Sequence, residues 1–175
     1  MTIQRDNKGY TSTPLRGNNS QTINQYKTNP KGIKQKTMAT LNTYLNFNGN
    51  TEEAFNFYKL VFGGEFLVVQ RYKDSPGCDG IAIGDQEKLM HIALPIGGNI
   101  LMGTDITDPM PPATLGTCIS LSVDATSEDE AKRLFESLSA GGTVTMALEK
   151  TFWNALFGMT TDKFGIQWMV NYDYK

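Results

Sequence analysis

The chain has a single histidine, His91, in the stretch KLMHIALPIGGNILMGTD. Imidazole is the side chain whose unperturbed pKa lies closest to neutral pH, so His91 is the candidate catalytic residue, as a general base or a hydrogen-bond donor. No second histidine exists and no carboxylate stands at ligand spacing from His91, so a metal site centred on it has little support. A strand histidine bonded to a neighbouring backbone group or acid is the structural alternative, and the sequence leaves both open.

Two further groups of side chains could line a site. Cys118 alternates with Ser120 and Ser122, so its thiol is either part of a pocket wall or a small buried residue. The stretch TFWNALFG holds Phe152, Trp153 and Phe157, which either wall an apolar pocket or close the core. No G-x-G-x-x-G, Walker A, G-x-S-x-G or H-E-x-x-H pattern is present, so nucleotide-phosphate binding and serine hydrolysis have no support from a motif.

The spacing of apolar residues predicts the elements that must position these side chains. Residues 41–47 alternate as in a half-buried strand, with one face made of Leu41, Thr43, Leu45 and Phe47 and the other of Asn42, Tyr44 and Asn46. A helix capped by Thr51 and ended by Gly63-Gly64 follows. Strands are then predicted at about 65–72, 88–95 and 99–104, with a mainly loop segment at 73–87 and a hairpin turn at 96–99.

The same order of elements recurs in the second half of the chain. A strand at 117–124, with Ile119, Leu121 and Val123 inward, precedes a helix capped by Ser127, and strands follow at about 143–150, 154–161 and 166–172. The apolar helix positions of the two halves differ by a constant 77 residues. The predicted fold class is therefore α+β, with two βαβββ units at about 40–105 and 117–173 joined by a linker at 110–116.

Composition separates an N-terminal segment from the folded part. Residues 1–37 hold seven basic side chains and one acidic side chain with almost no aliphatic residues, which predicts a flexible, basic, polar extension. Residues 38–175, predicted to form a single domain, hold 9 basic and 17 acidic side chains, which argues against a nucleic-acid partner. No apolar run approaches a membrane span and no secretory signal is apparent, so a cytoplasmic protein without a membrane partner is expected.

Four stretches carry a resemblance to a known family: YLNFNGNTEEAFNFYKLVFGGE, MHIALPIGGNILMGTD, DEAKRLFESLSAGG and TFWNALFGMTTDKFGIQWMVN. Together they resemble the PhnB-like branch of the vicinal-oxygen-chelate superfamily, which includes glyoxalase I, extradiol dioxygenases and the fosfomycin and bleomycin resistance proteins. The resemblance covers about residues 38–173. It implies that the tandem βαβββ units form a curled mixed-sheet cup, and that such half-cups pair between chains in a homodimer.

The resemblance also implies positions for a metal, which this superfamily holds with two residues from each unit, usually His, Glu or Gln. The corresponding positions here are Asn42, Met102, Cys118 and Met169. Thioethers suit Cu(I) rather than the divalent metals of the superfamily, so a cup without the usual metal, and no cofactor, is expected. The alternative is a divalent metal at a displaced site that uses His91, Asp105 or Cys118, although Asp105 could equally be a turn or cap residue.

The resulting hypothesis is a protein that binds a small, partly apolar or anionic molecule in its cup, with the question of catalysis left open. The candidate binding residues are His91, Tyr44, Asn42, Cys118, Phe152, Trp153, Phe157 and Met169. The alternatives are a metal-dependent isomerase, lyase or transferase of the glyoxalase type, or a dimeric interaction module. Proteins of this branch are often labelled as demethylubiquinone methyltransferases, but no Gly-rich loop for a nucleoside methyl donor follows a predicted strand.

Overall fold

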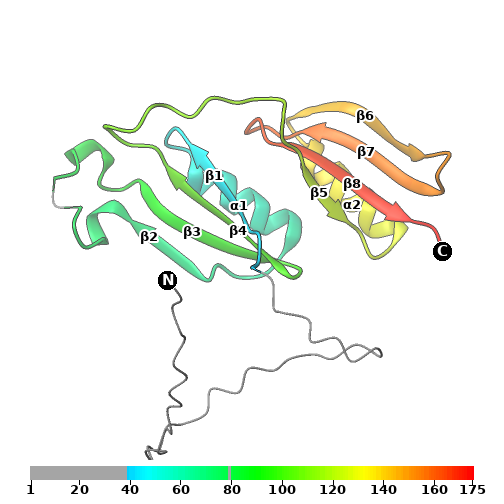
Figure 1. Ribbon diagram of the computed structural model, residues 1–175, viewed down its shortest axis with the longest axis horizontal. Helices are drawn as coiled ribbons and strands as arrows, with labels where there is room; N and C mark the ends of the chain where they lie inside the picture. Colours follow the sequence, from blue (N-terminus) through cyan, green and yellow to red (C-terminus); the bar gives the residue numbers. More distant parts are fainter. Residues whose placement is uncertain (1–38, 79) are drawn as a thin grey trace, which may run out of the picture. The chain divides into compact units, whose positions relative to one another are not determined.

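The computed structural model describes residues 39–78 and 80–175, which form two four-stranded sheets and two α-helices (Figure 1). The predicted extension at 1–37 lies outside these residues. The first sheet has the spatial order β1-β4-β3-β2, with β1 (Thr43–Phe47), β2 (Val68–Arg71), β3 (Leu89–Ile96) and β4 (Asn99–Asp105). The second has the order β5-β8-β7-β6, with β5 (Leu121–Asp124), β6 (Thr143–Lys150), β7 (Ala155–Thr161) and β8 (Gln167–Asp173). The tandem βαβββ repeat is thereby confirmed.

Each sheet mixes parallel and antiparallel pairs in the same way. In the first sheet β1 runs parallel to β4, with Thr43 opposite Leu101, and β3 is antiparallel to both of its neighbours. In the second sheet β5 is parallel to β8, and β7 is antiparallel to β6 and β8. A parallel pair cannot be joined by a tight turn, so a helix makes part of each connection. These are α1 (Thr51–Phe62) and α2 (Glu128–Ser139).

The two halves share one hydrophobic core. Helix α1 contributes Phe55 and Tyr58, α2 contributes Leu134 and Leu138, and all four side chains are buried in one cluster with residues of both sheets. The Tyr58 ring lies 5.5 Å from that of Trp168, between centroids, which joins the first helix to the second sheet. Each helix therefore covers one face of its own sheet and also contacts the other half.

Several predicted element boundaries were wrong. The predicted strand at 65–72 is confined to Val68–Arg71, and that at 117–124 to Leu121–Asp124. Ile119, predicted to face inward, is 73% exposed, because β8 begins at Gln167 and pairs with β5 only from Leu121 onward. Leu41, predicted to share a strand face with Leu45 and Phe47, precedes β1 and is exposed.

The helix termini confirm one predicted cap and correct the other. Ser127 accepts a hydrogen bond from the Glu130 backbone N–H at 3.1 Å, as predicted. Thr51 is not the N-cap but the first residue of α1, and the preceding Asn50 makes no capping hydrogen bond with its side chain. The carboxylate of Asp105, at the end of β4, accepts the Thr51 N–H instead. None of the described helices is long and apolar enough to cross a membrane.

Candidate functional site

The first sheet has one face covered by α1 and one that none of the described helices covers. Because side chains alternate along a strand, the uncovered face can be traced from the strand register. Tyr44 lies opposite Met102, Asn46 opposite Thr104, and His91 opposite Gln70. The centre of this open face of the first sheet consists of two aromatic rings, a thioether and neutral polar groups.

Tyr44 and His91 contact each other on this face. The Tyr44 hydroxyl lies 3.2 Å from His91 Nδ1, and the two rings are stacked with centroids 5.7 Å apart and planes 19° apart. Both side chains remain partly exposed. Burial raises the pKa of the Tyr44 phenol, so at neutral pH this group keeps its proton. The structure thus places the candidate catalytic histidine on an accessible face beside a hydrogen-bonding partner that the sequence pattern did not reveal.

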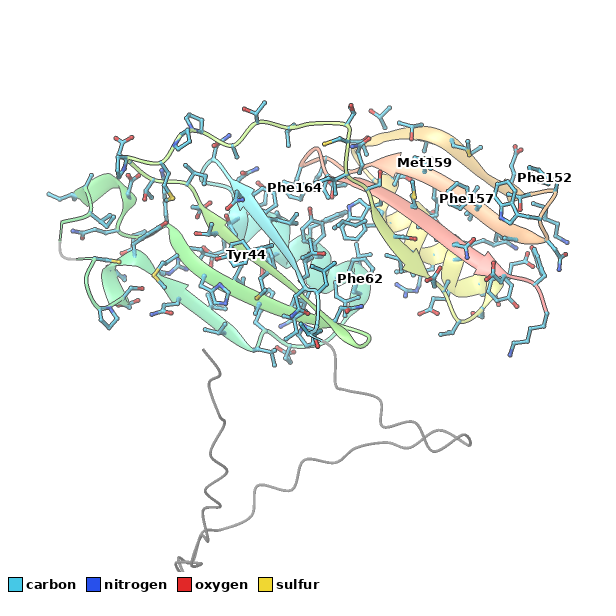
Figure 2. All side chains as sticks on the ribbon, viewed as in Figure 1. Tyr44, Phe62, Phe152, Phe157, Met159 and Phe164 are labelled. Atoms are coloured by element: carbon cyan, nitrogen blue, oxygen red, sulfur yellow. The ribbon has the colours of Figure 1, made fainter. Side chains whose placement is uncertain are left out.

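The open face of the second sheet is rich in sulfur and aromatic carbon. Met159 lies opposite both Met146 on β6 and Met169 on β8, so the three share one face. Phe157, on the same strand and face as Met159, lies 6.0 Å from the Trp153 ring, measured between centroids. Figure 2 labels Phe157 and Met159 on this sheet and Phe152 near its end. We call this surface the methionine–aromatic face.

The aromatic cluster does not close the core. Phe152 and Trp153 lie in the connection between β6 and β7, where they are 96% and 51% exposed. Their rings contact each other edge to face, with centroids 4.7 Å apart. Of the two roles that the sequence left open, closure of the core between the halves is therefore wrong for both residues.

The remaining candidate residues occupy separate places. The Asn42 side-chain oxygen accepts a hydrogen bond from Ile100 N–H at 3.0 Å, which ties the start of β1 to β4. Cys118 is exposed and precedes β5 rather than lying within it. The structure therefore brings Tyr44 and His91 together, and separately Trp153, Phe157 and Met169, but leaves Cys118 outside both sets.

Asp105 and Asp162 are buried acids whose partners the sequence did not indicate. The Asp105 carboxylate accepts hydrogen bonds from Thr51 N–H at 3.0 Å, Thr51 Oγ1 at 2.6 Å and Leu89 N–H at 2.8 Å. Helix N-termini favour negative charge and often bind anionic ligands. At the N-terminus of α1 the Asp105 carboxylate provides this charge. Asp105 is therefore a helix-capping residue and not a free site acid.

The described residues do not fit the metal site that the fold family implies. The strand register pairs Met102 with Tyr44 and Met169 with Ser122. The side chains around these two methionines therefore offer phenol, hydroxyl and thioether groups. Such donors are poorly suited to the divalent metals of the superfamily. Within residues 39–78 and 80–175, no three His, Cys, Asp or Glu side chains are close enough to hold an ion, so the displaced site is not assembled.

A groove of about 830 Å³ lies elsewhere, where β1 and β5 form the edges of their sheets. Its lining includes Phe62, Leu134 and Trp168 from the core side, with Arg133 and Glu130 from α2. None of the candidate binding residues lines it. The groove carries charges of both signs, so its chemistry does not define one class of ligand.

Comparison with known proteins places this chain in a family. A sequence profile of the family described as 3-demethylubiquinone-9 3-methyltransferase matches residues 39–171. The chain belongs to this family. The protein named YjdN from Escherichia coli (strain K12) is 31% identical over 140 residues, which are 75% of this chain and 93% of that protein.

Solved structures agree with this membership. The protein PA1353 from Pseudomonas aeruginosa is 40% identical with a TM-score of 0.71, over 79% of this chain and 100% of its own. A PhnB protein from Bacillus cereus is 27% identical with a TM-score of 0.61, over 77% of this chain and 99% of its own. The resemblance to the PhnB-like branch and the α+β fold class are thereby confirmed.

Proposed function

We propose that this protein binds a small, partly apolar or anionic molecule on the open face of the first sheet, around Tyr44 and His91, without the metal of the superfamily. The observation that carries the proposal is the exposed, hydrogen-bonded stack of these two rings. The partly exposed Met102 provides an apolar contact beside it, and Gln70 provides an amide. A mainly apolar surface with a few convergent polar groups is typical of small-molecule sites.

The expected result for His91→Phe is a loss of about tenfold in affinity for a ligand that binds here, because phenylalanine keeps a planar ring but removes one hydrogen bond. Ligands can be found by thermal denaturation with a library of small metabolites, where a ligand raises the melting temperature as its concentration increases. Ser120→Ala, a change in the separate groove, is the matched control. If every ligand found binds the His91→Phe variant as tightly as the unchanged protein, the Tyr44–His91 site is wrong.

A metal-dependent isomerase, lyase or transferase remains the alternative enzymatic function. Metal analysis of the purified protein distinguishes metal-free ligand binding from metal-dependent catalysis. Stoichiometric divalent metal that is lost in His91→Ala would refute the metal-free proposal. Methyl transfer, which the description of the family names, has no support from the fold. A nucleoside cofactor would place its acceptor groups at the N-terminus of the helix that follows the first strand. In this chain the Asp105 carboxylate already accepts hydrogen bonds from Thr51 at that end of α1.

We also propose that two copies of the chain pair and cover the methionine–aromatic face. Trp153 and Met146 are both about half exposed, and Phe152 is almost fully exposed. Exposed apolar side chains that gather on one surface usually mark an interaction site. A second copy would bury these rings and complete a cup from half-cups. The acidic charge of the folded part also supports a role without nucleic acid, and the free Cys78 and Cys118 support a location in the reducing cytoplasm.

Trp153→Glu is expected to convert the dimer into monomers, because a carboxylate would have to lose its hydration at the interface. Sedimentation velocity of the two proteins at matched concentrations measures this change. Leu60→Glu is the control, since Leu60 is 84% exposed on α1, away from the methionine–aromatic face. A monomeric unchanged protein, or the same dissociation in both variants, would contradict the proposed interface.

A further inference from the structure

The hydrogen bond between Tyr44 and His91 involves one particular nitrogen. The Tyr44 hydroxyl approaches Nδ1, although β4 lies between the two strands that carry these residues. The phenol therefore extends across β4, on the same face as Met102, which lies opposite Tyr44. Figure 2 shows Tyr44 on the first sheet. Because the two rings are also stacked, this geometry fixes which imidazole nitrogen faces the phenol and which is left for other partners.

The direction of this hydrogen bond follows from the chemistry of the two groups. Phenol is a stronger acid than a neutral imidazole N–H, and an imidazole nitrogen lone pair is a stronger acceptor than a phenolic oxygen. The favoured arrangement therefore has Tyr44 O–H donating to His91 Nδ1. The Thr104 hydroxyl also lies beside the Tyr44 oxygen, but a hydroxyl oxygen accepts less strongly than an imidazole nitrogen, so His91 is the favoured acceptor of the Tyr44 proton. Its own proton has the carbonyl oxygens of Leu89 and Asp105, each 3.2 Å away, as acceptors.

A neutral imidazole that accepts at Nδ1 carries its proton at Nε2. Within residues 39–78 and 80–175, no hydrogen-bond partner of Nε2 is present, and the side chain is partly exposed. The neighbours on this face, Gln70, Asn46 and Thr104, are all neutral. The group available to a ligand at the centre of the open face is therefore a neutral N–H donor, beside the apolar surface of Met102.

We propose that Tyr44 is a positioning residue that holds His91 as the Nε2–H tautomer, so that the site selects molecules that present an oxygen acceptor, a carboxylate or carbonyl, on an apolar planar body. The inference rests on the proposed function, because it assigns the ligand class of the same site. It adds a role for Tyr44 that can be measured in the ligand-free protein.

The tautomer is directly measurable because His91 is the only histidine in the chain. Long-range ¹H–¹⁵N NMR of the full chain, above the pH at which the imidazole is protonated, gives one pair of ring-nitrogen signals. We expect protonated Nε2 and an accepting Nδ1. Tyr44→Phe keeps the ring and removes only the hydroxyl, so the Nδ1–H fraction should rise about fivefold, which corresponds to one typical hydrogen bond. Tyr172→Phe, the same change on the second sheet, should leave the fraction unchanged.

Benzoate and benzamidine provide a matched pair of probes for the ligand class. Both are planar rings of similar size, but benzoate presents oxygen acceptors and benzamidine presents N–H donors. We expect benzoate, and not benzamidine, to shift the Nε2 signal, and Tyr44→Phe to weaken this response. An Nδ1–H tautomer, or no change in Tyr44→Phe, would overturn the role of Tyr44 while leaving ligand binding possible. A response to benzamidine alone would overturn the ligand class. The expected tautomer with no response to either probe would count against the proposed function itself and, with it, the ligand class.

Discussion

Replacing Asp105 with alanine is expected to lower the free energy of unfolding by roughly 3–5 kcal/mol, one of the two largest effects of a single substitution in this chain. Asp105 is 2% exposed, and its carboxylate accepts hydrogen bonds from Thr51 N–H, Thr51 Oγ1 and Leu89 N–H. Alanine would leave these three donors buried without an acceptor, and each such donor costs about 1–3 kcal/mol. Relief of the desolvation of a buried carboxylate offsets part of this loss.

Urea denaturation followed by circular dichroism measures the effect. Asp105→Asn keeps one acceptor oxygen, so its loss should be smaller than that of the alanine variant. Asp85→Ala is the matched control, because Asp85 makes a peripheral ion pair with Lys88, at 2.7 Å, of a kind worth about 0–1 kcal/mol. Equal losses for Asp105→Ala and Asp85→Ala would show that the buried hydrogen bonds do not carry the stability assigned to them.

The alternation of side chains in the sequence predicted the open face of the first sheet. Period 2 in residues 41–47 separated Tyr44 from the partly buried Leu45 and the buried Phe47, and the structure places Tyr44 on the face that α1 does not cover. The repeat of strand, helix and three strands predicted the sheets for the same reason, because each unit repeats the same local pattern. Patterns of this kind involve only residues that are close together in the sequence, so they can be recognised without the structure.

Contacts between distant residues could not be predicted in this way. Tyr44 and His91 are 47 residues apart, and their contact depends on β4 lying between β1 and β3. The glycine of the DKFG turn illustrates both sides of this limit. A glycine at the end of such a stretch is typical of a turn that needs a positive φ, and Gly165 has a φ of +84°. That an added Cβ would collide with the side chain of Leu115 follows only from the tertiary packing.

The position of β5 was missed for a related reason. The alternating sequence at 117–124 favours a strand throughout, but a strand needs a neighbour with free backbone groups. Strand β8 supplies that neighbour only from Leu121, and the Gln167 side chain donates to the carbonyl oxygens of Gly116 and Ile119, each at 3.0 Å. Cys118 therefore lies in the connection before β5, outside the face to which its alternation with serine had assigned it.

Asp162→Ala is expected to cause a comparable loss of roughly 3–5 kcal/mol, and in addition to weaken the joint between the two halves. The Asp162 carboxylate is 3% exposed and accepts hydrogen bonds from Tyr58 O–H and Trp168 Nε1–H, both at 2.8 Å. It also accepts the backbone N–H groups of Phe164 and Ile166, at 2.9 and 3.0 Å. Tyr58 belongs to α1, and the other three partners belong to the second half of the chain, so one acid connects both.

The Tyr58–Asp162 hydrogen bond can be separated from the rest of this network by a double-mutant cycle. Tyr58→Phe removes one of the four donors to the Asp162 carboxylate. Burial, together with this carboxylate, raises the pKa of Tyr58, so the phenol stays protonated at neutral pH and can donate. We expect Tyr58→Phe to cost about 1–2 kcal/mol and nearly nothing further when Asp162 is already alanine. The indole N–H signal of Trp168 should shift in Asp162→Ala and remain in place in Asp173→Ala, an exposed acid on the same sheet. Additive losses in the cycle would mean that the Tyr58–Asp162 hydrogen bond does not help to hold the halves together, since the apolar contact of the Tyr58 and Trp168 rings survives in the phenylalanine variant.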